Sequence, residues 1–171
     1  MLEELLTNKA LNAKEQTAAL AQLILSGDIS VEEVTGYAAG AKDPAKGNCI
    51  EAMEYASQQR PELVTEAAIR FVIDSLAAKA PRVRWEAAKV IANTIYLHAR
   101  HTGDAVNGLL ANTTHSGTVV RWSAATALAS IVKLKTSMNE TLVPALQAIM
   151  DAEEKNSIKK IYMAALKQAA K

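Results

Sequence analysis

Apolar residues recur at three- and four-residue spacing along almost every long stretch of the chain, and alternating β-branched runs are absent. This spacing places apolar side chains on one face of an α-helix, whereas strict alternation is typical of a strand. Helix-breaking groups interrupt the pattern at regular intervals: Ser-Gly-Asp (26–28), Lys-Asp-Pro (42–44), Arg-Pro (60–61), Ala-Pro (80–81), Thr-Gly-Asp (102–104), Ser-Gly (116–117) and Ser-Met-Asn (137–139). The pattern predicts an all-α protein whose helices are joined by short turns.

One sequence motif occurs twice along the chain. The segment PRVRWEAAKVIANTI begins at Pro81 and TVVRWSAATALASIV begins at Thr118, so that Arg84 and Arg121 are 37 residues apart. Weaker copies lie 36 residues before the first segment and 38 residues after the second. A period of this length over four copies is typical of a solenoid in which pairs of helices stack.

Each copy is expected to contain two helices. The first helices are expected at 30–41, 61–78, 104–114 and 139–152, and the second helices at 47–58, 82–99, 118–134 and 156–170. We interpret residues 1–171 as one repeat domain, because no linker divides them. It would comprise an N-terminal cap (1–29), in which a helix or hairpin spans residues 2–26, and repeats at about 30–60, 61–101, 102–137 and 138–171.

Composition and charge narrow the class of protein further. Half of the 171 residues are hydrophobic but only 4% are aromatic, so small and aliphatic side chains must fill the core. Ala88 and Ala125, which follow the two Val-Arg-Trp motifs, are expected to be buried where helices approach closely. The net charge of +1 creates no whole-molecule field that would attract nucleic acid or a membrane.

The single cysteine, Cys49, excludes an intramolecular disulfide and is expected to pack as a small buried hydrophobe. No apolar run approaches the roughly 18 residues of a membrane span, and the first residues do not form a signal peptide. We therefore expect a soluble, cytoplasmic protein.

The repeat motifs resemble those of HEAT repeats, the α-solenoid relatives of armadillo repeats. The residues that carry the resemblance are Leu142, Pro144, Leu146 and Asp151 in a first helix, followed by Ile158-Lys159, Val83-Arg84 and Val120-Arg121 at the starts of second helices. The resemblance implies a right-handed α-α superhelix of about four helical hairpins plus the N-terminal cap. It also implies a concave face, lined by the second helices, where partners commonly bind.

The chain departs from the HEAT pattern in two respects. Its period is shorter than the 40 to 47 residues usual for HEAT repeats. Only Asp43, Asp74 and Asp151 lie near the family's aspartate position, and the third copy has His115 there. A ladder of aspartate–arginine pairs along the stack would therefore be incomplete.

Five residues are candidates for partner binding: Arg84, Trp85, Arg121, Trp122 and Lys159. The three basic residues occupy equivalent positions, so they would form a ladder along the stack; the favoured interpretation is that they tie neighbouring layers together, and the alternative is that they face a partner. The two tryptophans would either pack between repeats, which is favoured, or form an aromatic and cationic strip with the arginines.

Other side chains that suggest chemistry have simpler interpretations. His98, His101 and Asp104 have a spacing that could suit a metal, but Gly103 is expected to break the helix between them and no fourth ligand is evident. Histidines in the last turn of a helix also suit its negative end. The tyrosines are expected to pack in or beside the core, with Tyr55 aligned on Ile91. No metal site, cofactor or catalytic residue is predicted.

The sequence favours a non-catalytic scaffold that binds a protein or peptide on the concave face of the second helices. The alternatives are a HEAT-like nucleic-acid-binding protein or DNA glycosylase, or a protein similar to phycobilin lyases. Nucleic-acid binding is not favoured because it usually requires an excess of Lys and Arg that this chain lacks. No membrane partner is expected, and the oligomeric state is left open.

Overall fold

A computed structural model describes all 171 residues, which form ten α-helices and no strand. The α-helices are α1 (Leu2–Thr7), α2 (Ala13–Ser26), α3 (Val31–Gly40), α4 (Asp43–Gln59), α5 (Glu66–Ser75), α6 (Pro81–Thr94), α7 (Thr102–Asn112), α8 (Thr118–Val132), α9 (Asn139–Ala152) and α10 (Asn156–Ala169). Three short 3-10 helices complete the chain: η1 (Pro61–Leu63), η2 (Ile95–Leu97) and η3 (Ala99–His101). The all-α prediction is confirmed.

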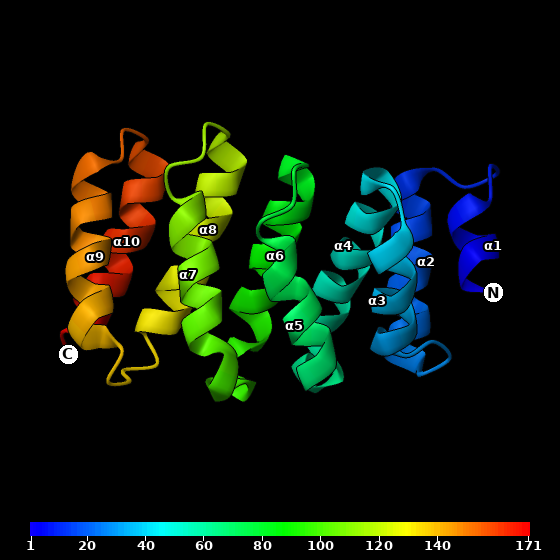
Figure 1. Cartoon of the computed structure of the whole chain (residues 1–171), viewed down its shortest axis with the longest axis horizontal. Coiled ribbons are helices and arrows are strands. Elements are labelled where there is room, and N and C mark those ends of the chain that lie inside the picture. The colour runs from blue at the N-terminus through cyan, green and yellow to red at the C-terminus, as the bar shows by residue number, and fades with distance from the viewer.

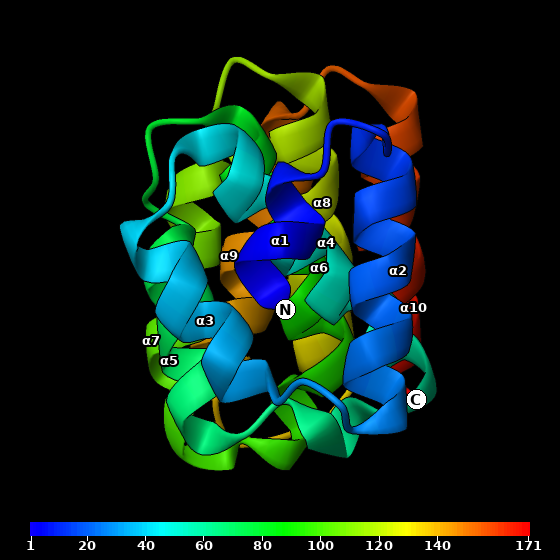
Figure 2. The same ribbon diagram turned by 90° about the vertical axis from the view of Figure 1, so that its right-hand side faces the viewer.

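The α-helices are arranged in two layers, with the two termini at opposite ends of the stack (Figure 1). The even-numbered helices from α2 to α10 lie side by side in one layer, and each packs closely on the next. The helices α3, α5, α7 and α9 form the other layer, whose members contact one another less. Figure 2, seen along the stack, shows α3, α5 and α7 on one side and α2 and α10 on the other. The stack is an armadillo- or HEAT-like α-α solenoid of four helical pairs plus the N-terminal α1 and α2.

Local sequence signals explain where several helices begin and end. Asn12 and Ser30 each form a capping box, in which the side chain accepts from the backbone N–H three residues on and the Glu at that position returns the bond. Pro81 occupies the first position of α6, where its missing N–H has no helical acceptor to bond. Gly27 ends α2 in the left-handed region, with φ of 85°, which a glycine adopts at no steric cost.

One continuous hydrophobic core runs through the stack between the two layers. Alanines are numerous where the second helices meet, and Ala88 of α6 and Ala125 of α8 are fully buried, as predicted. Such short side chains let the backbones of neighbouring helices approach closely. Cys49 is also buried in this core, and desolvation raises the pKa of its thiol to about 12.

Some predicted helix boundaries were wrong. The helix predicted at 61–78 is divided into η1 and α5, because Thr65 caps a new helix after Val64. The helix predicted at 82–99 leaves α-helical geometry after Thr94 and continues as η2 and η3. Gly103 does not break a helix but lies in the first turn of α7.

The prediction for Tyr55 was also wrong, since this side chain is exposed whereas its supposed equivalent Ile91 is completely buried. Tyr96 is exposed as well, and only Tyr162 lies deep in the core. The weak first copy of the repeat, at 30–60, was therefore aligned slightly out of register in α4. None of the helices combines the length and hydropathy needed to cross a membrane.

Candidate functional site

The outer side of the second helices carries the two tryptophans. On α8, Trp122 lies on the side opposite the buried residue Val120 and is 41% exposed, and Val119, one turn before Trp122, is 49% exposed. On α6, Trp85 is half-buried, and its indole N–H donates to the Glu86 carboxylate at 3.0 Å. We call the solvent side of α4, α6, α8 and α10 the second-helix face. Trp122 is thus not packed away between repeats.

Arg84 links its own helical pair to the next one. Its Nε donates to the carbonyl oxygen of Ala78 at 2.5 Å, in the turn between α5 and α6. Its Nη1 donates to Oδ1 of Asn112 at 2.7 Å, at the end of α7. Asn112 is buried, and its side-chain nitrogen donates to the carbonyl oxygen of Leu76 at 3.0 Å. Both polar atoms of its side chain are therefore hydrogen-bonded.

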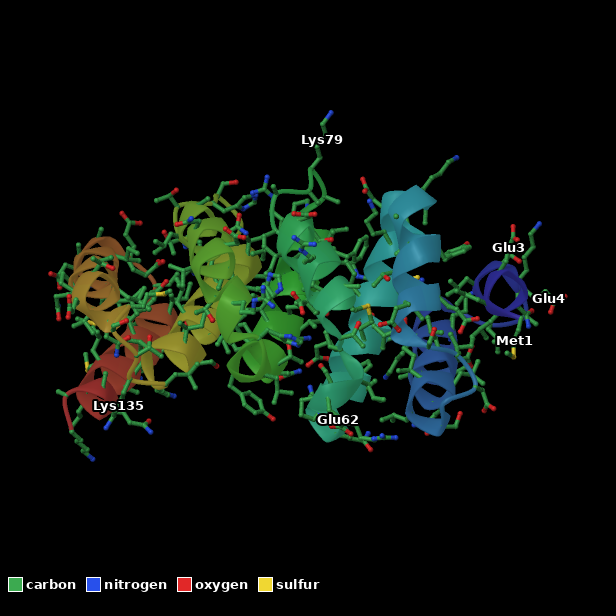
Figure 3. The ribbon with its side chains drawn as sticks, turned by 60° about the horizontal axis from the view of Figure 1, so that its bottom comes forward. Met1, Glu3, Glu4, Glu62, Lys79 and Lys135 are labelled. Atoms are coloured by element: carbon green, nitrogen blue, oxygen red, sulfur yellow. The ribbon has the colours of Figure 1, made fainter.

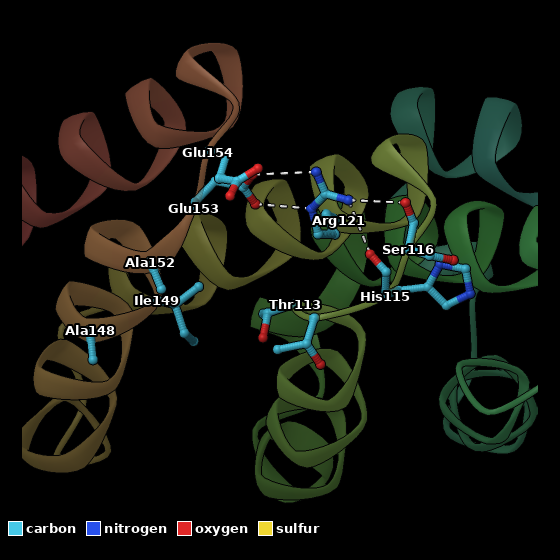
Figure 4. Close-up of a pocket in the computed structure, with 10 residues that line it drawn as sticks. Thr113, His115, Ser116, Arg121, Ala148, Ile149, Ala152, Glu153 and Glu154 are labelled. Carbon is cyan, nitrogen blue, oxygen red and sulfur yellow. Dashed lines mark hydrogen bonds and ion pairs between the residues drawn. The ribbon is translucent and has the colours of Figure 1, made fainter.

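Arg121 repeats this arrangement one repeat further along (Figure 4). Its Nη1 donates to the carbonyl oxygens of His115 and Ser116, at 3.1 and 3.2 Å, in the turn between α7 and α8. Its Nε and Nη2 donate to the two carboxylate oxygens of Glu153, at 3.1 and 3.4 Å, in the turn before α10. Both arginines therefore engage the turns, and neither joins a tryptophan in a strip.

The partners of the two arginines differ from the predicted aspartates. Asn112 and Glu153 fill this role, while the Oδ1 of Asp151 accepts from Gln147 on its own helix instead. Burial of Glu153 would raise its pKa, but the hydrogen bonds from Arg121 and from the backbone N–H of Lys155 outweigh it, so the pKa lies below its ordinary value. Lys159, the third predicted member, is half-buried and takes part in no ion pair.

A cluster of charges between α4 and α6 was not anticipated from the sequence. Nη2 of Arg82 lies 2.6 Å from a carboxylate oxygen of Glu51, and its Nη1 donates to Asn48 at 2.8 Å. Nζ of Lys89 lies 3.7 Å from Glu54 and 3.5 Å from Glu86. The only sequence signal was local, namely the spacing of three residues between Glu51 and Glu54 and between Glu86 and Lys89.

Burial is the main influence on Glu86 in this cluster. Desolvation raises its pKa, and the nearby charge of Lys89 opposes this effect without cancelling it. Glu54 is almost wholly buried, and its Oε2 accepts no hydrogen bond. The three carboxylates of the cluster are thus paired with two cations of the same protein, Arg82 and Lys89.

Several hollows of the surface lie at the turns and in the layer of first helices. One of about 490 Å³ lies between the α7–α8 turn and the end of α9, and its lining includes Arg121, Glu153, His115 and Thr113 (Figure 4). A second, of about 350 Å³, lies between α7 and α9. The first is lined by polar and apolar side chains, and its only cation, Arg121, is already bound by Glu153 and two carbonyls.

The histidines predicted near the end of the second helix have separate partners. Nε2 of His98 lies 2.8 Å from the carbonyl oxygen of Val64, and Nε2 of His101 lies 3.1 Å from Glu66. Both contacts attach the η2–η3 segment to the start of α5, within the same helical pair. No group of three or more His, Cys, Asp or Glu side chains is placed to hold a metal ion.

Comparison with known proteins bears on the fold. No protein-family model and no curated protein sequence matches the chain. Among solved structures, a computationally designed armadillo repeat protein for modular peptide recognition superposes with a TM-score of 0.75 at 18% identity, over 98% of this chain and 80% of that one. A designed armadillo repeat protein in complex with the peptide (KR)4 gives 0.74 at 19% identity, over 98% and 80%. A chain in the complex of CpcE and CpcF of phycocyanin lyase from Nostoc sp. gives a TM-score of 0.71 at 18% identity, over 96% of this chain and 96% of that one. At these identities the likeness shows the armadillo- or HEAT-like fold alone.

Proposed function

We propose that the protein is a non-catalytic scaffold that binds a peptide, or an extended segment of another protein, on its second-helix face. The observation that carries the proposal is the exposure of Trp122 beside Val119 on the outer side of α8. Tryptophan is a favoured anchor of binding interfaces, because a large, rigid side chain loses much water-accessible area and little entropy on binding.

The rest of the fold supports this role by holding the face rigid. The second helices pack closely on one another, and Arg84 and Arg121 fasten each turn to the next repeat. A surface that is ordered before binding loses little conformational entropy when the partner arrives. The designed armadillo neighbours recognise peptides with the same architecture.

The proposal assigns different roles to the five candidate residues. Trp122, and to a lesser extent Trp85, would contact the partner through apolar burial. Arg84 and Arg121 would act indirectly, by maintaining the spacing of the repeats. Lys159 would add charge at the end of the stack, because no carboxylate of the protein binds it.

No specific observation favours the two alternatives. Binding to nucleic acid needs several phosphate contacts from Lys or Arg, yet the net charge is +1 and the two repeat-equivalent arginines are engaged within the protein. Similarity to phycocyanin lyase is limited to the fold.

Selection from a random dodecapeptide library displayed on phage, followed by calorimetric titration of the best peptide, tests the proposal. The Trp122→Ala protein should bind that peptide at least tenfold more weakly than the natural protein. Leu97→Ala is the matched control, because Leu97 is also exposed, at 46%, but lies in η2, away from α8 and α10, and its affinity should be unchanged. Selection of no peptide, or equal affinity in all three proteins, would contradict the proposal.

A further inference from the structure

The two halves of the second-helix face differ in charge. The helices α8 and α10 contain no acidic residue. The acidic residues that follow Asp104 in the chain lie on α9 or in the turn after it: Glu140, Asp151, Glu153 and Glu154. Any charge that α8 and α10 present to solvent is therefore positive.

Three lysines of this half lie on the same side as Trp122. Lys133 is eleven residues after Trp122, about three helical turns, and Lys160 is 38 residues after it, which is the interval that aligns α10 with α8. Lys167 lies two turns beyond Lys160 on the same side of α10. The alignment is supported by burial, since Val120, Ala124 and Ala127 of α8 correspond to Ile158, Tyr162 and Ala165 of α10, and all six are buried.

These three lysines are free of internal partners. All three are exposed, and none takes part in an ion pair of the protein. An exposed ammonium beside an apolar surface can gain attraction from an incoming carboxylate at little desolvation cost, because it leaves no existing partner.

The α4–α6 half of the face carries carboxylates, but these are already paired with cations of the protein. Glu51 is bound by Arg82, and Glu54 and Glu86 lie around Lys89. A basic peptide would have to displace these cations from largely buried carboxylates. This half therefore does not present free carboxylates for lysine or arginine side chains.

We infer that the partner of the second-helix face is an acidic peptide segment, whose apolar side chain covers Trp122 and Val119 while its carboxylates meet Lys133, Lys160 and Lys167. The inference rests on the proposed function and names the chemistry of the partner. The charge of such a peptide would be opposite to that of the (KR)4 peptide bound by the designed armadillo neighbour.

A peptide fits this surface better than a nucleic acid does. Three lysines around an apolar centre match a short segment with a few carboxylates and one large apolar residue. A duplex would need a longer basic track, and Arg84 and Arg121 cannot extend it because their guanidinium groups are bound at the turns.

The experiment examines the charge of the peptides that the library selection yields. The best peptide, a copy in which each Asp and Glu is replaced by Lys, and a duplex oligonucleotide are each titrated into the natural protein and two variants. One variant is Lys160→Glu/Lys167→Glu. The control is Lys9→Glu/Lys79→Glu, which has the same net charge; Lys79 projects from the α5–α6 turn, well away from α10 (Figure 3).

We expect the selected peptides to be acidic with an apolar residue, and their affinity to fall as salt rises. The α10 variant should bind on the order of tenfold more weakly, while the control variant binds like the natural protein. Selected peptides that are basic or neutral, or that bind both variants equally, would overturn the inference and leave peptide binding intact. Tighter binding of the duplex than of any peptide, or no selected peptide at all, would overturn both.

Discussion

Arg121 of α8 and Glu153, which precedes α10, form a two-point ion pair across the boundary between repeats, with N–O distances of 3.1 and 3.4 Å. Arg84 and Asn112 make the equivalent contact one repeat earlier, at 2.7 Å. The same guanidinium also donates within its own turn, to one backbone carbonyl in the case of Arg84 and to two in the case of Arg121. A single side chain thus closes the turn within one pair of helices and holds the next pair in register.

Arg121→Ala should destabilise the protein by about 2–4 kcal/mol, because it leaves the nearly buried carboxylate of Glu153 without its cation. Arg84→Ala should cost less, about 1–2 kcal/mol, because its partner Asn112 is neutral. Urea denaturation monitored by circular dichroism measures both values. If the two arginines instead contact the partner, the variants would keep their stability and lose affinity for the selected peptide.

The Arg121–Glu153 pair also predicts a pH dependence. The pKa of Glu153 is lowered in the folded protein, so its contribution to stability is present above the ordinary value of 4.5 and is lost as pH falls through the folded value. Glu153→Gln should therefore be less stable than the natural protein at pH 7, and the difference should shrink as the pH falls below about 4.5 and through the lowered pKa. A difference that stays constant over this range would show that the charge of Glu153 is not involved.

Glu86→Gln should show the opposite behaviour. Burial raises the pKa of Glu86, so the ionised carboxylate weakens the fold at pH 7, and stability is lost as pH rises through the folded pKa. The amide of the variant retains an oxygen that can accept the hydrogen bond from the Trp85 indole, and the ion pair between Lys89 and Glu54 remains. Denaturation at pH 7 should find the variant as stable as the natural protein or more so, with any advantage vanishing below about pH 4.5. A large loss at pH 7 would mean that the Glu86–Lys89 pair outweighs the cost of burial.

Two glycines inside helices provide a matched test of the packing between repeats. A Cβ at Gly108 of α7 would lie 2.7 Å from Cδ1 and 3.3 Å from Cβ of the buried Leu76, whereas a Cβ at Gly36 of α3 would meet nothing within 4 Å. Gly36→Ala should therefore stabilise the protein by about 0.5–1 kcal/mol through helix propensity. In Gly108→Ala the steric clash with Leu76 should outweigh the gain in helix propensity, so the melting temperature should fall. Equal melting temperatures for the two variants would show that α5 and α7 are less closely packed than described.

The fold could be predicted from the sequence because its signals are local and repeated. The two Val-Arg-Trp segments mark the starts of α6 and α8, and the burial of Ala88 and Ala125 follows from their position on the helix. Boundaries were less predictable where a 3-10 turn replaced the last α-helical turn, as after Thr94, because both geometries suit the same residues.

The contacts of the candidate site depend on how the repeats stack, which the sequence does not reveal. Arg82 meets Asn48 and Arg84 meets Asn112 across 34 and 28 residues, distances in the chain that are set by turn lengths and by the stagger of neighbouring helices. The two tryptophans illustrate the same limit. They are equivalent in sequence, yet a glutamate follows Trp85 and binds its indole, whereas Ser123 follows Trp122.

The central claim is that partners bind on the second-helix face, and it is tested most directly by nuclear magnetic resonance of the tryptophan indole N–H groups. The protein has only two tryptophans, so it gives two indole signals, which Trp122→Phe would assign. On titration with the selected peptide, we predict that the Trp122 signal shifts most, that the Trp85 signal shifts less because its N–H is bound to Glu86, and that the amide signals of α8 and α10 shift with them. Unmoved indole signals, with shifts confined to α5, α7 and α9, would contradict the claim and place the partner in the grooves of the first helices.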